Sequence, residues 1–330
     1  MSIVVVLGSN SFSGSDFVDL LLRESEQRVV GVSRSPQKSN LFLPYLSREH
    51  ARRFQFVQLD LNRDMRALQQ LLAALEPAFV VNFASQSEVA PSWQNPEQWA
   101  QTNVVSTTAL IDFLAGKRWL QRYLHISTPE VYGNCTGTVT EDAPFRPSTP
   151  YAASRAGAEL MLQVFHRRGA LPLSIVRSAN VYGAHQQLHK ILPRSVIYRK
   201  LGRTIDLHGG GYARRSFIHI GDVSRGELAV LKHGRPGEAY HLATLQTVAI
   251  RELVEHVCRL AGSSLAQCTR EVGARPGHDD AYLLDCTKAR RELGWEPRIS
   301  LDEGIAQVVD WIDREWDRIR VEPLEYVHRR

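Results

Sequence analysis

The sequence predicts an α/β protein in which a doubly wound parallel sheet is followed by a smaller C-terminal α/β lobe. Short apolar runs alternate with longer amphipathic segments through the first half, and a glycine-framed turn follows the first run. After about residue 177 the alternation becomes irregular, and Gly, Pro, Arg and His become more frequent. A chain of 330 residues can bury two cores. We therefore expect one domain over 1–177, with a returning segment near 217–242, and a second domain mainly over 178–330.

Six buried strands are expected, because each is a short run rich in Val, Ile, Leu, Phe or Tyr. They are Ile3–Leu7, Val29–Val32, Phe54–Leu59, Phe79–Phe83, Tyr123–Ile126 and Leu173–Val176. Between most of them, apolar residues recur at helical spacing. The helices expected are Asp16–Arg23, Met65–Leu75, Trp99–Leu114 and Ala152–Phe165. Strands joined by helical crossovers run parallel, so Gly8, Asn82 and Glu130, which follow or end strands, should meet at one crevice.

Composition and charge indicate a globular enzyme. The chain is 43% hydrophobic and 23% charged, with a net charge of +5 spread along its length, so a generally basic surface is favoured over a nucleic-acid site. The four cysteines have no metal-like spacing and are expected to be reduced thiols, with no metal bound. Without a leader pattern or a long apolar run, we expect a cytoplasmic protein that has no membrane partner. The charged stretch after Trp316 is expected to be loosely held.

The turn after the first strand predicts a dinucleotide site. Glycines let backbone N–H groups approach a pyrophosphate at a helix N-terminus, where the helix dipole favours negative charge. Ser11 stands midway in the turn and could offer its hydroxyl to a phosphate. The alternative is a plain tight turn. The candidate contacts are Gly8, Ser9, Asn10, Ser11, Phe12, Ser13 and Gly14.

The end of the second strand bears on the choice of cofactor. A carboxylate there would bind the adenosine ribose of NAD, whereas an arginine accommodates the 2′-phosphate of NADP. The residues present are Ser33, Arg34 and Ser35. They favour NADP, with NAD as the alternative and a plain surface role for Arg34 also open. Asp60 and Leu61, at the end of the third strand, are expected near the adenine.

Two motifs, STPEVYG at 127–133 and PYAASRA at 150–156, carry the groups for chemistry. Thr128 and Glu130 follow a strand, while Tyr151 and Arg155 lie four residues apart and so share one helix face. A cation beside a phenol favours the phenolate and should lower the tyrosine pKa. These groups together suggest a site that oxidises an alcohol and removes a proton next to the resulting ketone.

These motifs, with VNFASQS, RSANVYG, RRSFIHIGDV, RPGHDDAYLLD and ARRELGWEP in the same order, give the chain a resemblance to a known family. The chain resembles the extended short-chain dehydrogenase/reductases, and within them the nucleotide-sugar 4,6-dehydratases that act on dTDP-glucose or GDP-mannose. The resemblance covers nearly the whole length. It implies a Rossmann domain, a nucleotide-sugar-binding lobe, and a homodimer or higher homo-oligomer formed through two helices of the large domain.

The resemblance also implies a role for each catalytic residue. Tyr151 would take the proton of the sugar 4-hydroxyl while Thr128 holds that oxygen, and Arg155 stands where the family usually has lysine. Glu130 would remove the proton at C5. Pro129 replaces the aspartate with which the dTDP-glucose enzymes protonate the departing 6-hydroxyl. The GDP-mannose type lacks that aspartate too and uses the glutamate for both steps.

Further contacts follow from the resemblance, each with a structural or surface role as the alternative. Those expected near the cofactor are Phe83, Ala84, Ser85, Gln86 and Ser127, together with Tyr151 and Arg155. Those expected near the nucleotide sugar are Ser87, Glu88, Asn180, Val181, Arg215, Arg275 and His278. Glu88 departs from the histidine often found there, which points to a different sugar.

The function expected is redox-neutral conversion of a nucleotide-diphosphate hexose or heptose to its 4-keto-6-deoxy form, in deoxysugar or polysaccharide biosynthesis. The alternatives are a decarboxylase of a nucleotide hexuronate, a C4 epimerase, and a catalytically silent NADP-binding regulatory protein. An epimerase would leave Glu130 without a task. The retained Thr128, Glu130 and Tyr151 argue against the silent protein. Base, sugar and pathway stay open.

Overall fold

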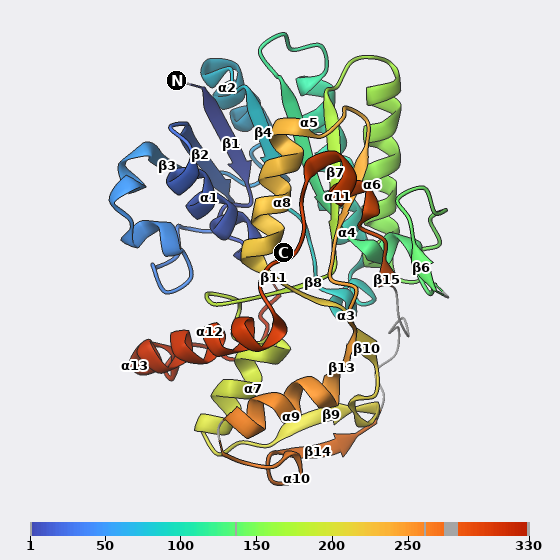
Figure 1. Cartoon of the computed structure of the whole chain (residues 1–330). Coiled ribbons are helices and arrows are strands. Elements are labelled where there is room, and N and C mark those ends of the chain that lie inside the picture. The colour runs from blue at the N-terminus through green and yellow to red at the C-terminus, as the bar shows by residue number, and fades with distance from the viewer. Residues whose placement is uncertain (1, 136, 261, 274–282, 329–330) are drawn as a thin grey trace.

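A parallel sheet forms the centre of the larger part of the protein, and a smaller lobe lies beneath it (Figure 1). This computed structural model describes residues 2–135, 137–260, 262–273 and 283–328. The expected doubly wound α/β fold is confirmed. No helix in the described part of the chain combines the length and apolar composition needed to cross a membrane.

The central sheet has seven strands, and every pair in it is parallel. In spatial order they are β12 (Ala239–Leu242), β7 (Leu173–Ser178), β5 (Arg122–Ser127), β4 (Phe79–Asn82), β1 (Ile3–Leu7), β2 (Arg28–Ser33) and β3 (Phe54–Gln58). All six expected strands belong to it. The order reverses between β1 and β4, and ligands of such sheets bind outside the strand ends at that point.

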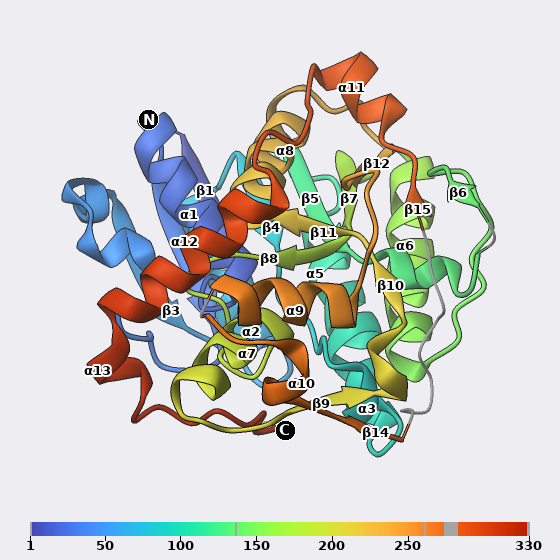
Figure 2. The same cartoon turned by 60° about the horizontal axis from the view of Figure 1, so that its bottom comes forward.

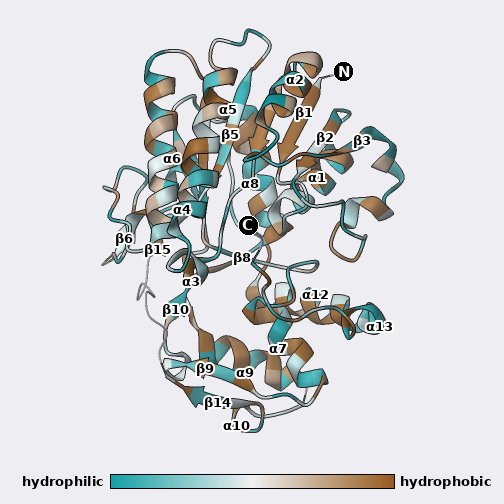
Figure 3. Ribbon diagram, turned by 180° about the vertical axis from the view of Figure 1, so that it is seen from behind, coloured by the Kyte–Doolittle hydropathy of each residue, from teal (hydrophilic) through white to brown (hydrophobic). Residues whose placement is uncertain are grey.

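Helices cover both faces of the sheet and bury a separate core on each. Alternation along β1 divides its side chains, with Val4 and Val6 in one core and Val5 and Leu7 in the other. Figure 3 shows the hydrophobic character of this strand. The first core is covered by α1 (Phe12–Glu24), α8 (Ile220–His233) and α11 (Thr287–Leu293). The second is covered by α2 (Met65–Leu75), α5 (Thr107–Leu114) and α6 (Pro150–Arg167).

The single helix expected over Trp99–Leu114 is wrong in its first half. The chain there forms α4 (Pro96–Trp99), a π-helical turn η3 (Ala100–Ser106) and then α5. In a π-helical turn each hydrogen bond spans one residue more than in an α-helix, so the side chains that follow are rotated around the helix axis. The side chain of Asn103 in this turn makes three hydrogen bonds to Gln86 and Ser154, which compensate for the irregular backbone.

The smaller lobe has its own two cores and little sheet (Figure 2). Its main helices are α7 (Ile191–Lys200), α9 (Ile250–Leu260) and α12 (Leu301–Arg314). Its shorter helices are α10 (Leu265–Cys268) and α13 (Trp316–Ile319), whereas the short helix α3 (Val89–Ser92) packs on α4 and α6 of the large domain. The remaining strands pair in twos: β8 (Asn180–Tyr182) with β11 (Phe217–His219), β9 (Ile205–His208) with β14 (Thr269–Val272), β10 (Arg214–Arg215) with β13 (Val248–Ala249), and β6 (Thr138–Val139) with β15 (Leu283–Leu284).

The chain crosses between the two parts more than once. After β7 it enters the lobe, and it returns through β11 to form α8, which packs on α1, and β12, which pairs with β7. The four cysteines are free thiols, and three of them are buried. Within the described ranges, no three His, Cys, Asp or Glu side chains gather in a way that could hold a metal ion.

Candidate active site

The N-terminus of α6 presents Tyr151 to the crevice. Thr149 caps the helix by accepting a hydrogen bond from the Ala152 N–H at 3.1 Å, and Pro150 occupies the first helical position. The Tyr151 N–H donates to Ser92 Oγ at 3.2 Å, so the residue is held from α3 as well. Its phenol is therefore fixed at the start of a long, well-anchored helix.

Thr128 and Glu130 lie in a tight turn directly after β5. Thr128 caps the 3-10 turn η4 (Pro129–Tyr132), because its Oγ1 accepts the Glu130 N–H at 3.3 Å. Pro129 takes the first position of this turn, which suits its fixed φ. Thr128 also hydrogen-bonds the Tyr151 hydroxyl, and the charge of Glu130 acts on the same phenol. The structure thus brings these three residues together.

Arg155 acts on Tyr151 in the expected direction and lowers its pKa, but the net shift of this pKa is upward. The pKa of this phenol is raised to about 12, first because burial disfavours the phenolate and then because Glu130 is negative. The positive charge of Arg155 and the Thr128 hydrogen bond act in the opposite direction, but they are outweighed. A single cation does not compensate for both desolvation and a neighbouring carboxylate.

Arg155 is itself buried and anchored to the sheet. Its guanidinium donates to the Ile126 carbonyl oxygen of β5. Within the described part of the chain, its buried Nε has no hydrogen-bond partner. The guanidinium lies close enough to Tyr123 and His125 to shift both of their pKa values. Arg155 is thus a buried cation that is bound to β5, the strand that ends just before Thr128.

A cavity of about 270 Å³ lies between the sheet edge and the lobe. The large domain contributes Ser127, Thr128 and Tyr151 to its wall, while the lobe contributes residues of β8 and α7 with the segment between them. The lobe residues are Asn180, Val181, Tyr182, Gln186, Lys190, Ile191 and Leu192. The cavity therefore joins the catalytic candidates to the expected sugar contacts Asn180 and Val181.

The turn after β1 needs a glycine at position 8. Gly8 has a φ of +82°, and a Cβ there would lie 2.7 Å from the Ala84 backbone nitrogen, so only glycine fits. Ser11 caps α1 by accepting the Gly14 N–H at 3.0 Å. Its hydroxyl keeps one hydrogen to donate. Ser9 and Phe12 are buried, and Ser13 is half-buried, on the same turn.

Ser33 and Ser35 brace this turn from the end of β2. Ser33 Oγ accepts the Asn10 N–H at 3.0 Å, and the Asn10 side chain donates to Ser35 and to Pro36. Arg34 lies between the two serines and is half-buried. The two hydroxyls thus serve the protein's own loop, which leaves Arg34 as the charged group at this strand end.

The other expected cofactor contacts are mostly enclosed at strand ends. Asp60 accepts the Asn62 N–H at 2.8 Å, and Leu61 is buried. Phe83 packs on Phe17 of α1 at 5.6 Å between ring centroids. Gln86 is buried and receives the Asn103 contacts, whereas Ala84 and Ser85 are half-buried and Ser87 is exposed.

Glu88 joins the two parts of the protein across the crevice. Its carboxylate meets Lys190 Nζ at 2.6 Å and His189 Nε2 at 3.4 Å. Burial opposes its ionisation, but these two partners outweigh burial and lower the pKa of Glu88 to about 2. Glu88 is thus an anion whose cation, Lys190, lines the cavity.

Two residues of the site were missed by sequence reasoning. Asn103 was placed on an ordinary helix, and only the π-turn reveals that it braces the Gln86 loop. Lys190 precedes α7 and is one of many lysines and arginines, so no spacing singled it out.

The lobe candidates are placed unevenly. Asn180 donates its side-chain amide to the Ser216 carbonyl at 3.2 Å, and the Val181 carbonyl accepts from Gln186. Arg215 lies on β10, where its guanidinium reaches the Arg214 carbonyl at 2.8 Å. Arg275 and His278 lie outside the described residues.

The expectation of a loose C-terminal stretch is wrong for the described part of it. The Tyr198 hydroxyl donates to Glu325 at 3.0 Å, and Tyr326 packs edge-on against His189. His328 then stacks on Trp99 and approaches Gln98 at 2.7 Å. The segment therefore runs from α7 to α4, from the lobe to the large domain.

Comparison with known proteins agrees with this geometry. A family model described as GDP-mannose 4,6 dehydratase matches residues 5–308. The chain is 32% identical over 321 residues to the dTDP-glucose 4,6-dehydratase of Streptomyces niveus, covering 95% of this chain and 94% of that protein.

Among solved structures, the chain is similar to DesIV, a dTDP-glucose 4,6-dehydratase from Streptomyces venezuelae with NAD and TYD bound. The TM-score is 0.89 at 32% identity, covering 98% of this chain and all (100%) of that one. MoeE5 in complex with UDP-glucose and NAD is similar with a TM-score of 0.84 at 29% identity, covering 96% and 100% of the two chains.

Proposed function

The chain belongs to the nucleotide-sugar 4,6-dehydratase family of extended short-chain dehydrogenase/reductases, and from that premise we propose how its own residues divide the reaction. The reaction converts a nucleotide-diphosphate sugar to its 4-keto-6-deoxy form. The observation that carries the assignment is the hydrogen-bonded pair of Thr128 and Tyr151, with Glu130 beside it, at one end of a shared cavity.

Tyr151 removes the proton of the sugar 4-hydroxyl, and Thr128 orients that oxygen. A nicotinamide cofactor, when bound, would supply a reversible hydride acceptor for C4 oxidation and for the later reduction at C6. The pKa of Tyr151 is raised to about 12 with the charge of Arg155 already included, so proton removal needs positive charge beyond that of Arg155. The Arg155 guanidinium lowers the pKa of the phenol and acts as an electrostatic group.

Glu130 acts in the elimination. A ketone at C4 acidifies the C5–H bond, and the Glu130 carboxylate takes this proton. Pro129 has no proton to give, so Glu130 passes the same proton to the 6-hydroxyl, which leaves as water. The hydrogen from C5 and the hydroxyl from C6 account for the water lost. When hydride returns to C6, C5 gains one proton, which balances the proton taken from the 4-hydroxyl.

The cofactor-binding domain is proposed to comprise residues 1–177 with the segment near 217–242, and the nucleotide sugar to bind mainly through residues 178–330.

We propose NADP as the preferred cofactor, because the only charged residue at the end of β2 is Arg34. The solved relatives named above hold NAD. Titrating NADP and NAD into the wild type and Arg34→Ala decides between them: selective loss of NADP affinity supports the proposal, and equal affinities in the wild type contradict it.

A homodimer through the large domain is proposed as well. Leu160 and Val164 on α6 and Val105 on η3 are exposed apolar side chains on two elements that pack together. Light scattering of the wild type and Leu160→Glu tests this face. A dimer that becomes a monomer supports it, whereas a wild-type monomer overturns it.

The test of the function is mass spectrometry after incubation with NADP or NAD and a panel of nucleotide sugars of different bases. We expect a product lighter by one water and no net change in cofactor oxidation. Glu130→Gln should bind cofactor normally and fail to release water. Release of carbon dioxide, or an isomer of unchanged mass, would replace the proposal by decarboxylation or epimerisation.

A further inference from the structure

One buried ion pair holds both ends of the turn that carries the catalytic groups. We call residues 127–133 the catalytic turn. At its start, Ser127 Oγ donates to the Glu159 carboxylate of α6. Near its end, the Tyr132 hydroxyl accepts from the Arg177 guanidinium of β7. Glu159 and Arg177 meet each other at 2.6 Å, and their side chains are only 1% and 4% exposed.

The geometry of this pair is rigid. Arg177 Nε lies 3.1 and 3.2 Å from the two Glu159 oxygens, and the adjacent nitrogen makes the 2.6 Å contact. The third guanidinium nitrogen reaches Tyr132 and also the Glu141 carbonyl at 3.1 Å. A planar guanidinium bound on two sides has little freedom to rotate. Its two protein anchors therefore keep a fixed separation.

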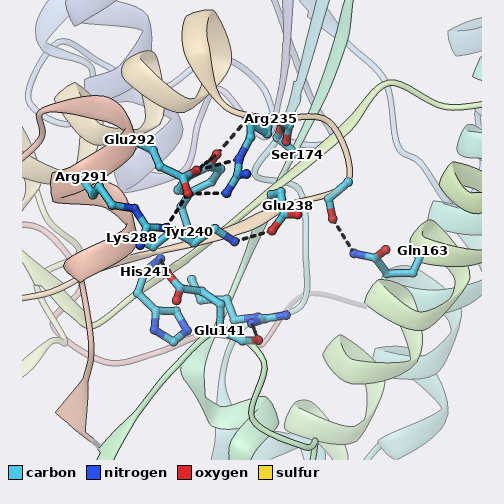
Figure 4. A network of polar contacts seen from close by, with 12 residues as sticks. Glu141, Gln163, Ser174, Arg235, Glu238, Tyr240, His241, Lys288, Arg291 and Glu292 are labelled. Carbon is cyan, nitrogen blue, oxygen red and sulfur yellow. Dashed lines mark hydrogen bonds and ion pairs between the residues drawn. The ribbon is translucent and has the colours of Figure 1, made fainter.

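The donors and acceptors can also be assigned where the network continues from Tyr132 to His241. The Tyr132 hydroxyl lies 2.7 Å from His241 Nε2, and His241 Nδ1 lies 3.1 Å from the Asp285 carbonyl. Since that carbonyl only accepts, the ring proton is on Nδ1 and Nε2 accepts from Tyr132. Figure 4 shows His241 beside Glu141, whose carboxylate receives the His241 backbone N–H at 3.0 Å. The shorter contact of the Tyr132 hydroxyl is thus the one to His241, and its contact with the Glu141 carbonyl is longer, at 3.4 Å.

Stability alone is a weak reason for such a pair, because two buried charges cost desolvation that their attraction barely offsets. Their contacts with the turn suggest another reason. We propose that Glu159 and Arg177 are positioning residues for the dehydration, and that they act through Ser127 and Tyr132 on the groups between them. This inference rests on the roles proposed above for Thr128 and Glu130.

The proposed reaction requires accurate placement of the residues in the catalytic turn. Thr128 must reach the C4 oxygen while Glu130, two residues later, must serve both C5 and the C6 oxygen. A displacement of about 1 Å at such a site can cost about 100-fold in rate. Fixing both ends of a short turn limits the movement of the carboxylate more than of Tyr151, because Tyr151 lies at the start of α6, where the Thr149 cap and Ser92 also hold it.

The chain offers a matched control for Tyr132. Tyr240 on β12 is also a fully buried tyrosine whose hydroxyl is hydrogen-bonded, with the Arg235 N–H at 2.9 Å and Glu292 Oε2 at 3.0 Å. Figure 4 shows Tyr240 close to Arg235 and Glu292. Tyr240 has no hydrogen bond to the catalytic turn. Removing the Tyr240 hydroxyl breaks two partly buried hydrogen bonds, whereas removing the Tyr132 hydroxyl breaks those with Arg177, His241 and the Glu141 carbonyl. Only the Tyr132 hydroxyl belongs to the catalytic turn.

The experiment compares Tyr132→Phe with Tyr240→Phe in the intact enzyme, with folding checked by circular dichroism and thermal melting. We expect similar, small losses of melting temperature. Tyr132→Phe should lower kcat about tenfold or more with little change in KM, while Tyr240→Phe stays within about twofold. Because elimination slows more than oxidation, reduced nicotinamide should accumulate in the steady state of Tyr132→Phe, visible by its near-ultraviolet absorbance.

A second pair of variants tests the ion pair itself. Arg177→Lys keeps the charge but not the fork, and Glu159→Gln keeps an acceptor for Ser127. Both should fold and accumulate reduced nicotinamide, with turnover between those of the wild type and Tyr132→Phe. Equal kcat and equal cofactor spectra for Tyr132→Phe and Tyr240→Phe would overturn the inference. Absence of water loss in the wild type on every sugar would instead overturn the proposed function, so the two failures are distinct.

Discussion

Two ion pairs of the same length show how differently the two parts of the protein use charge. Arg177 and Glu159 meet at 2.6 Å within the large domain, and so do Arg270 and Asp206 on the lobe. The side chains of the first pair are 4% and 1% exposed, and those of the second are 68% and 38% exposed. The first pair continues into a buried network, whereas the second links two strand surfaces. The N–O distance alone therefore does not indicate which ion pair contributes to a buried network.

The same contrast separates the two walls of the crevice. The wall from the sheet is fixed by caps, a helix start and buried hydrogen bonds, which suits groups that must be placed accurately for bond breaking. The wall from the lobe uses Lys190, bound to Glu88 across the crevice. We infer that the sheet determines the chemistry and the lobe the choice of ligand.

The largest expected effect concerns the fixed wall. Replacing Tyr151 by Phe removes the proton acceptor but leaves the helix start intact, so kcat should fall by about 10²- to 10⁴-fold. Cofactor titration serves as the control, because binding should change little. Turnover within twofold of the wild type would mean that another group takes the 4-hydroxyl proton.

The next effect sharpens the contrast between the ion pairs. Arg177→Met leaves the Glu159 carboxylate buried without its cation, which should lower the free energy of unfolding by about 3–5 kcal/mol. Urea unfolding measures the loss. Adding Glu159→Leu to the same chain should recover part of it, because no buried charge then remains. A single variant as stable as the wild type would show that water reaches the site.

A smaller effect depends on pH. Burial, and next the Arg177 charge, lower the pKa of His241 to about 3, against about 6.5 in an unfolded chain. The unfolded state therefore binds a proton that the folded state refuses, so stability is complete above pH 6.5 and falls as the pH drops toward 3. The stability difference between wild type and His241→Gln should change by up to about 1.4 kcal/mol per pH unit in this window. Urea titrations from neutral pH downward measure it, and a constant difference would contradict the assignment.

The smallest effect is expected on the lobe. Arg270→Gln breaks an exposed pair that solvent already screens, so neither melting temperature nor turnover should change beyond experimental scatter. The comparison with Arg177 would fail if this variant were as destabilised as Arg177→Met.

Much of the large domain follows from sequence because its signals are local. The six apolar runs became strands of one parallel sheet, and parallel strands end at a common edge, which is why Thr128 and Tyr151 meet. The π-helical turn at Asn103 was not predicted, because the apolar residues there have the spacing of an ordinary α-helix.

Other features depend on the surroundings that a residue acquires in the fold. The burial of Arg177 and Glu159 was not predicted, because it depends on how β7 and α6 pack together. The direction of the Tyr151 pKa shift was missed for the same reason, since desolvation is a property of the packed site. The tail was misjudged because its contacts with α4 and α7 join residues far apart in the sequence.

The placement of β12 at the edge of the sheet has a consequence for synthesis. The strand that covers β7 is encoded some sixty residues after it, and the helix that packs on α1 is encoded just before β12. On a ribosome adding about 5–20 residues per second, the nucleotide-binding half must wait several seconds after β7 emerges before its sheet can close. During that interval β7 presents an unpaired edge, which is when a nascent chain is most open to chaperones or to mispairing with a neighbour.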